Sequence, residues 1–114
     1  RVIGQSMGRD HDHLAVLMRR QASERLAAFL HGLSERYARI GLPPLQFTLP
    51  MSREDIAQYL GLALETVSRG FSRLQDDGVI AVQGRRIGIV NPGELERLAH
   101  GIVPSLAAPQ PLAR

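Results

Sequence analysis

The chain has 114 residues, of which 44% are hydrophobic and 22% charged, so it suits one small globular domain with a modest core. Its net charge is +3 and its isoelectric point is about 10.5, because arginine dominates the basic residues and stays charged at any working pH; this balance favours a polyanionic partner. The chain contains no cysteine, which excludes disulfides, thiolate metal sites and cysteine nucleophiles.

The sequence shows no signal for a membrane or for export. No apolar run is long enough to span a bilayer, and the first residues lack the charged-then-apolar order of a signal peptide. We therefore expect a cytoplasmic protein without membrane contact. Because the sequence also begins without methionine, we expect it to be part of a longer protein.

Residues 1–18 are predicted to form a helix that pairs with its own copy. Apolar side chains recur there at steps of four and three residues, at Ile3, Met7, Leu14 and Leu17, and Asp10 continues the series. Glycines at positions 4 and 8 each weaken an isolated helix by about 1 kcal/mol, so the alternative is a frayed terminal helix. In a symmetric pair Asp10 faces its copy, and the repulsion between the two carboxylates weakens the dimer.

His11 and His13 point to different sides of a helix, so they predict no metal site.

A second helix is predicted from Gln21 to Ile40. Its apolar residues recur at the steps of one helical face that we expect to be core: Leu26, Phe29, Leu30, Leu33, Tyr37 and Ile40. Gly41 ends this helix and two prolines stiffen the turn that follows, because proline fixes its own φ and restricts the residue before it. The alternation over Phe47–Leu49 then indicates a short strand.

Two short helices separated by a glycine turn are predicted next. Ser52 stands three residues before Asp55, a capping pattern in which side-chain oxygens satisfy the free amides of a helix start. The inward residues of this first helix are Ile56, Ala57 and Leu60. Gly61 ends it. The second helix runs from Leu64 to Asp77, and its inward stripe consists of Leu64, Val67, Phe71 and Leu74.

A β-hairpin and a last helix complete the predicted domain. The β-branched runs Val79–Val82 and Ile87–Val90 flank a turn that carries Arg85 and Arg86. Pro92 suits the first turn of a helix over Glu94–His100. The predicted units are therefore the end of a dimerisation helix (1–20), a domain that is mainly α with a small β-hairpin (21–101) and a disordered tail (102–114).

Helix, glycine turn, helix and basic hairpin make up the winged helix-turn-helix plan, in which the second helix enters the DNA major groove. Its residues opposite the apolar stripe are polar or charged: Glu65, Ser68, Arg69, Ser72 and Arg73. Arginine donates two parallel hydrogen bonds to guanine, and glutamate accepts one from cytosine, so Glu65 and Arg69 could read the two strands of one G·C pair or neighbouring pairs. The alternative is an ordinary solvated ion pair, but that alternative leaves the hairpin arginines unexplained.

Other classes of function fit this pattern less well. An enzyme is not predicted, because there is no phosphate-binding glycine motif and the serines and histidines lack an activating context. RNA recognition relies on exposed aromatic rings, whereas Phe29, Tyr37 and Phe71 lie on inward stripes. A winged helix that only binds protein or dimerises, without sequence-specific DNA binding, remains the main alternative.

The segment MSREDIAQYLGLALETVSR, Met51 to Arg69, resembles the helix-turn-helix signature of the Crp/Fnr regulators of bacteria, and RLAAFL at Arg25–Leu30 resembles the helix before it. The E-x-x-S-R pattern is similar to the Fnr branch. The resemblance implies a homodimer on the inverted repeat TTGAT-N4-ATCAA, with Glu65, Ser68 and Arg69 reading bases. The expected contacts to the DNA backbone are Ser52, Arg53, Thr66, Ser72, Arg73, Arg85 and Arg86, and the expected dimer contacts are Ile3, Met7, Asp10, Leu14 and Leu17.

The sequence departs from this family pattern in two places. Ala63 stands where the family often has a serine or threonine cap, whose loss typically costs about 1 kcal/mol of helix stability. The family's sensory β-roll is absent, so an iron-sulfur cluster or other effector is expected only in a missing sensor domain and no cofactor in this chain. The family also implies RNA polymerase contact through the loop Gly41 to Phe47.

Overall fold

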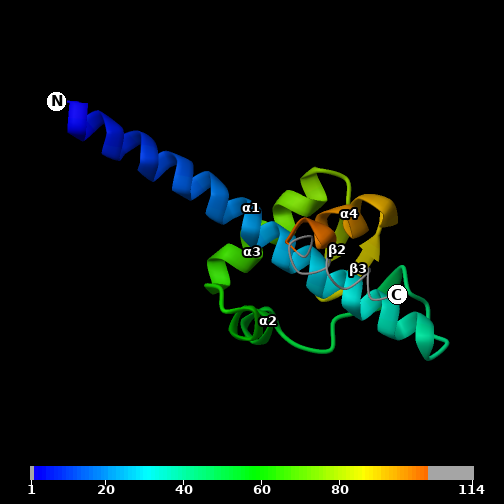
Figure 1. The fold of residues 1–114 in the computed structure, drawn as a ribbon. Coiled ribbons are helices and arrows are strands. Elements are labelled where there is room, and N and C mark those ends of the chain that lie inside the picture. The colour runs from blue at the N-terminus through cyan, green and yellow to red at the C-terminus, as the bar shows by residue number, and fades with distance from the viewer. Residues whose placement is uncertain (1, 103–114) are drawn as a thin grey trace, which may run out of the picture.

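The computed structural model describes residues 2–102, with side chains described for residues 14–101 except residue 15. It confirms the mainly α winged helix-turn-helix fold and adds a third strand to the expected hairpin (Figure 1). The elements in chain order are α1 (Val2–Arg39), β1 (Gln46–Thr48), α2 (Arg53–Leu60), α3 (Leu64–Asp76), β2 (Ile80–Gln83), β3 (Arg86–Ile89) and α4 (Pro92–Ile102).

The two helices expected on either side of residues 18–21 are one continuous helix, α1. Its N-terminal half stands clear of the domain, and its C-terminal half runs through it (Figure 1). The residues at the expected break are methionine, arginine and glutamine, which favour helix, so nothing there interrupts the hydrogen-bond ladder. Ile40 was expected in the core, but it lies beyond the helix and is 62% exposed. Directly after Ile40, Gly41 at φ +82° turns the chain away from the helix axis, and the Ile40 side chain is left uncovered.

The helix-turn-helix forms by the expected local signals. The Ser52 hydroxyl accepts a hydrogen bond from the amide of Asp55, whose carboxylate accepts one from the amide of Ser52. Gly61 ends α2 in the left-handed region at φ +70°, and Ala63 begins α3 without a side-chain cap. Leu64 is 43% exposed and not inward as predicted, because the first turn of α3 projects beyond the core.

The small sheet has the order β1-β3-β2, and both pairings are antiparallel. The hairpin strands are each shifted by one residue from the predicted runs, and Gly84 at φ +63° forms the turn between them. Phe47 of β1 pairs with Ile87 of β3, so two strands that are forty residues apart in the sequence are neighbours in the sheet. The register also aligns Thr48, Arg86 and Gln83 across the sheet.

The last helix starts earlier and ends later than predicted. Asn91 caps α4 by accepting a hydrogen bond from the amide of Glu94 through its side-chain oxygen, at 3.0 Å. Pro92 occupies the first turn, as expected. The helix includes Ile102, and the rest of the predicted disordered tail, residues 103–114, lies outside the described residues.

One hydrophobic core joins α1, α2, α3, α4 and the sheet. Its largest buried side chains include Leu26, Leu30, Leu49, Ile56, Phe71, Leu74, Ile80 and Leu95. Because α3 buries Val67, Phe71 and Leu74 in this core, the opposite face of α3 is directed outward. Within residues 2–102, no helix is long and apolar enough to cross a membrane.

Candidate nucleic-acid interface

The outward face of α3 carries the predicted base-reading residues. Glu65 and Arg69 are exposed, while Ser68 and Thr66 beside them are half-buried. The opposite face of the same helix is buried at Val67 and Phe71. The structure thus separates an apolar face that holds α3 in place from a polar face that is open to a partner.

Glu65 and Arg69 form an ion pair across one turn of this face. The guanidinium Nη2 donates to the carboxylate Oε2 at 2.7 Å, and the two side chains are 73% and 70% exposed. An exposed pair of this kind contributes only about 0.2–1 kcal/mol to stability, so little holds the two groups together against a stronger partner. The face therefore presents a planar hydrogen-bond donor, the Arg69 guanidinium, next to an acceptor, the Glu65 carboxylate.

Arg73 lies in a different environment from Arg69, although sequence analysis placed both on the outward face. It is half-buried, and its Nη1 donates to the hydroxyl of Ser23 in α1 at 3.0 Å. Its neighbour Ser72 is exposed, as expected. The side chain of Arg73 therefore points to α1, and α1 passes over this part of α3.

The start of α2 brings Ser52 and Arg53 next to α3. The Ser52 oxygen is used as an acceptor in the cap, which leaves its hydroxyl hydrogen free to donate. The Arg53 guanidinium carbon lies 4.8 Å from the centre of the Phe71 ring, a cation–π contact that orients this half-buried side chain. Both residues thus supply donors at the N-terminal end of a helix, where the backbone amides add positive potential.

The hairpin carries Arg85 in its turn and Arg86 at the start of β3, and both are exposed. The backbone of this tip is held from two sides: Leu49 donates from its amide to the carbonyl of Arg85 at 2.8 Å, and the side chain of Gln75 accepts from the amide of Val82. The second contact fixes β2 to α3. The backbone of the hairpin therefore has a fixed position relative to α3, and Arg85 and Arg86 extend from it as exposed side chains.

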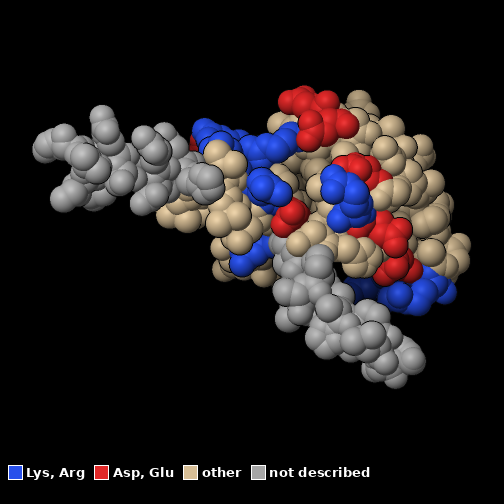
Figure 2. All heavy atoms as spheres, turned by 45° about the horizontal axis from the view of Figure 1, so that its top comes forward, with Lys and Arg blue, Asp and Glu red and all other residues tan. Residues whose placement is uncertain are grey.

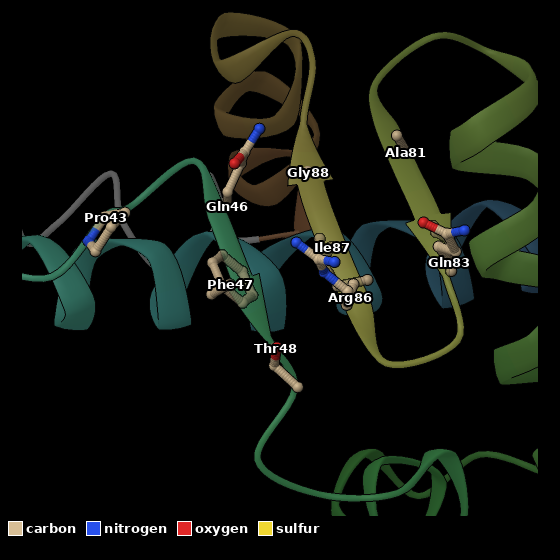
Figure 3. A pocket seen from close by; sticks show the side chains of 10 residues that line it. Pro43, Gln46, Phe47, Thr48, Ala81, Gln83, Arg86, Ile87 and Gly88 are labelled. Carbon is tan, nitrogen blue, oxygen red and sulfur yellow. The ribbon is translucent and has the colours of Figure 1, made fainter.

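The polar residues that surround Arg86 on the sheet were not predicted from the sequence. An open hollow of about 680 Å³ lies over the strands, and its lining includes Gln46, Thr48, Gln83 and Arg86 (Figure 3). Thr48 and Gln83 flank Arg86 in the register. The alternation of Gln46, Phe47 and Thr48 was the signal for this polar face, but the pairing of β1 with β3 was needed to place it there.

Arginines and carboxylates are interspersed on the face of the molecule drawn in Figure 2. This mixture agrees with the small net charge of +3. A surface of mixed sign attracts a polyanion only weakly at long range, so binding there depends on individual placed contacts.

The expected dimer contacts are only partly described. The side chains of Ile3, Met7 and Asp10 lie outside the described residues, as do those of His11 and His13. Leu14 and Leu17 are exposed on α1, together with Val16 and Met18. This part of α1 therefore presents apolar side chains to its surroundings, and a dimer remains a prediction.

Comparison with known proteins fits this geometry. A model of the Crp-like helix-turn-helix domain matches residues 24–98. The fumarate and nitrate reduction regulatory protein of Escherichia coli strain K12 is 47% identical over 90 residues, which cover 79% of this chain and 36% of that protein. The corresponding Salmonella typhimurium protein gives the same values. The chain thus spans little more than a third of the length of these relatives.

Solved structures give the same grouping. The catabolite activator protein of Thermus thermophilus matches with a TM-score of 0.72 and 25% identity, over 88% of this chain and 44% of that one. FixK2 from Bradyrhizobium japonicum matches with a TM-score of 0.59 and 42% identity, over 68% of this chain and 37% of that one. These relatives are regulators and not enzymes, as sequence analysis predicted for this chain. The chain therefore belongs to the Crp/Fnr family of transcription regulators, of which it contains the Crp-like helix-turn-helix domain.

Proposed function

We propose that this chain binds duplex DNA in a sequence-specific manner, as a homodimer on an inverted repeat resembling TTGAT-N4-ATCAA. The observation that carries the proposal is the pair of exposed groups, Glu65 and Arg69, on the face of α3 opposite its buried stripe. An α-helix fits the major groove of B-DNA, where base edges present distinct donors and acceptors. The outward face of α3 is the part of the domain that suits this groove.

The chemistry of the pair matches the single G·C pair in each TTGAT half-site. Arg69 donates to O6 and N7 of guanine, and Glu65 accepts from the N4 amino group of the cytosine opposite. The two side chains already lie 2.7 Å apart, so one base pair can satisfy both. Ser68, half-buried between them, reads a neighbouring base as a donor or acceptor, or contacts a thymine methyl group.

Contacts to phosphates fix the register of α3 in the groove. We assign them to Ser52 and Arg53 at the start of α2, to Thr66 and Ser72 on α3, and to Arg85 and Arg86 on the hairpin. Ser52 has a free hydroxyl hydrogen, and the hairpin arginines are exposed on a tip whose backbone is hydrogen-bonded to the amide of Leu49 and the side chain of Gln75. Arg73 was predicted to join this set, but its guanidinium donates a hydrogen bond to Ser23 of α1.

The dimer contact is assigned to α1. Residues 1–20 are the end of a dimerisation helix, with Ile3, Met7, Asp10, Leu14 and Leu17 at its seam, and residues 21–101 are the DNA-binding domain. The exposed side chains of Leu14 and Leu17 support this division. The seam also sets the spacing of the two half-sites.

The remaining assignments concern the longer protein. Its sensor, with an iron-sulfur cluster or another effector, lies outside this chain, and its location is the cytoplasm, where the DNA is. RNA polymerase contact involves the loop from Gly41 to Phe47, which exposes Leu42 and Leu45.

The proposal is tested by measuring binding to two fluorescent duplexes, one with the TTGAT inverted repeat and one with the same bases scrambled. We expect tighter binding to the inverted repeat at every salt concentration. Equal affinity for both duplexes would reject sequence-specific binding. No binding to either would favour the alternative, a winged helix that only binds protein or dimerises.

A further inference from the structure

Arg73 and Ser23 form a hydrogen bond between α3 and α1, fifty residues apart in the sequence. Arg73 Nη1 donates to Ser23 Oγ at 3.0 Å. Ser23 is only 8% exposed, and it is the one polar residue that is buried in the part of the chain with described side chains. A buried hydroxyl with an arginine partner is costly to leave unpaired, so this contact is favoured over release of Arg73 to water.

The same stretch of α1 contacts the helix-turn-helix at two further points. Leu26 approaches α3 so closely that a Cβ atom added at Gly70 would lie 3.1 Å from its Cδ2. Arg25 Nη1 donates at 2.9 Å to the carbonyl of Leu60, in the last turn of α2. One turn of α1 therefore touches both helices of the motif, and the Ser23 contact lies nearest the C-terminal end of α3.

We infer that Arg73 is a positioning residue for base reading, which acts through Ser23 to fix α3 against α1, and not a contact to DNA phosphate. This inference rests on the DNA-binding function proposed above. Arg69 and Arg73 are one turn apart, but Arg69 is exposed and paired with Glu65 on the same helix, whereas Arg73 reaches across to α1.

Arg73 is half-buried beside α1. It lines a hollow of about 300 Å³ between α1, α3 and α4, whose other charged side chains are Glu24 and Asp77 but also Arg19, Arg20 and Arg97. Because cations outnumber carboxylates there, the hydrogen bond to Ser23, and not charge balance, holds the Arg73 guanidinium in place. A guanidinium held there stabilises the crossing of α1 and α3, and a small rotation of α3 at this crossing would displace Glu65 and Arg69 from the base edges.

The two roles predict different DNA binding. If Arg73 contacted a phosphate, its loss would weaken binding to all duplexes alike and reduce the slope of log K against log salt by about 0.9. If it positions α3, its loss reduces discrimination between the inverted repeat and the scrambled duplex and leaves the slope unchanged. Ser23→Ala separates the roles further, because a buried serine beneath Arg73 matters only for positioning.

The experiment compares the 114-residue chain with Ser23→Ala and Arg73→Met, which keeps an apolar stem for packing. We expect each variant to lower discrimination by about three- to tenfold, since part of the lost hydrogen-bond free energy reaches the base contacts. The double variant should be no worse than Arg73→Met alone. Ser34→Ala is the matched control, because its hydroxyl donates from α1 to the carbonyl of Pro44, away from α3.

Amide hydrogen exchange of α3 in the same chains without DNA gives a second readout. We expect faster exchange in Ser23→Ala and Arg73→Met than in the parental chain and in Ser34→Ala. A flatter salt slope for Arg73→Met, with parental discrimination and exchange in Ser23→Ala, would overturn the inference. If the parental chain itself fails to discriminate, the proposed function is wrong, and the exchange rates alone then decide whether Arg73 positions α3.

Discussion

Replacing Arg69 by alanine is the sharpest test of base reading by α3. The side chain is 70% exposed and its one hydrogen bond is to Glu65, so its removal leaves no cavity. The loss of an exposed ion pair costs at most about 1 kcal/mol of stability, and the domain should remain folded. A bidentate contact to guanine is worth about 1–3 kcal/mol of discrimination against a wrong base. The expected loss of discrimination is therefore about 5- to 150-fold.

The assay for this variant uses fluorescence anisotropy with the TTGAT inverted repeat and with a repeat whose two G·C pairs are changed to A·T. The parental chain should prefer the first duplex, and Arg69→Ala should bind the two almost equally. The variant Arg39→Ala is the control, because it removes the same charge from an exposed position at the end of α1. Its preference should be that of the parental chain.

The same titrations at several salt concentrations show whether Arg69 acts on bases or on charge alone. A residue that reads a base changes the ratio between duplexes, whereas a phosphate contact changes the affinity for all of them. An equal loss on both duplexes, together with a slope reduced by about 0.9, would refute the assignment of Arg69 as a base reader.

Three further predictions concern the hairpin, the start of α3 and the last helix. Arg85→Ala or Arg86→Ala should weaken binding to specific and scrambled duplexes by the same factor and lower the salt slope by about 0.9; an altered preference between duplexes would argue against a phosphate role. Ala63→Ser should raise the free energy of unfolding by about 1 kcal/mol in urea titrations, because position 63 already has the extended geometry of an N-cap (φ −72°, ψ 150°); an unchanged midpoint would contradict this. The hydrogen bond from Arg97 holds the pKa of Glu94 below its ordinary value, so this pair stabilises the fold above the unfolded-state pKa and loses that contribution as pH falls through the lowered folded pKa. An NMR titration of Arg97→Ala should show the Glu94 pKa rising, and an unchanged value would contradict the cause.

The parts of the fold that depend on neighbours in the sequence were predictable. Ser52 and Asp55 are three residues apart, so their reciprocal hydrogen bonds follow from a pattern that can be read directly. Gly61 ends α2 for an equally local reason, since the left-handed conformation suits glycine. The periodicity that placed Val67, Phe71 and Leu74 inward also directed Glu65 and Arg69 outward.

The errors arise where burial is decided by another element. Leu64 and Ile40 continue apolar stripes, but each lies at a helix end that no other element covers, and both are exposed. The continuity of α1 was missed because its apolar pattern changes near residue 20, although the backbone contains no helix breaker there. The pairing of β1 with β3 depends on a register that no local pattern encodes.

Arg69 and Arg73 show how much of a candidate site depends on contacts distant in sequence. They are the same residue type on one helix, and their positions differ by only about 40° around its axis, because four residues make slightly more than a 3.6-residue turn. What separates them is α1, which contacts α3 at Gly70 through Leu26 and at Arg73 through Ser23. A Cβ atom at position 70 would lie 3.1 Å from Leu26 Cδ2, so the Leu26 side chain would have to shift by a few tenths of an ångström. The partner that each arginine finds, Glu65 on the same helix or Ser23 on α1, therefore depends on where α1 crosses α3, which no pattern within α3 encodes.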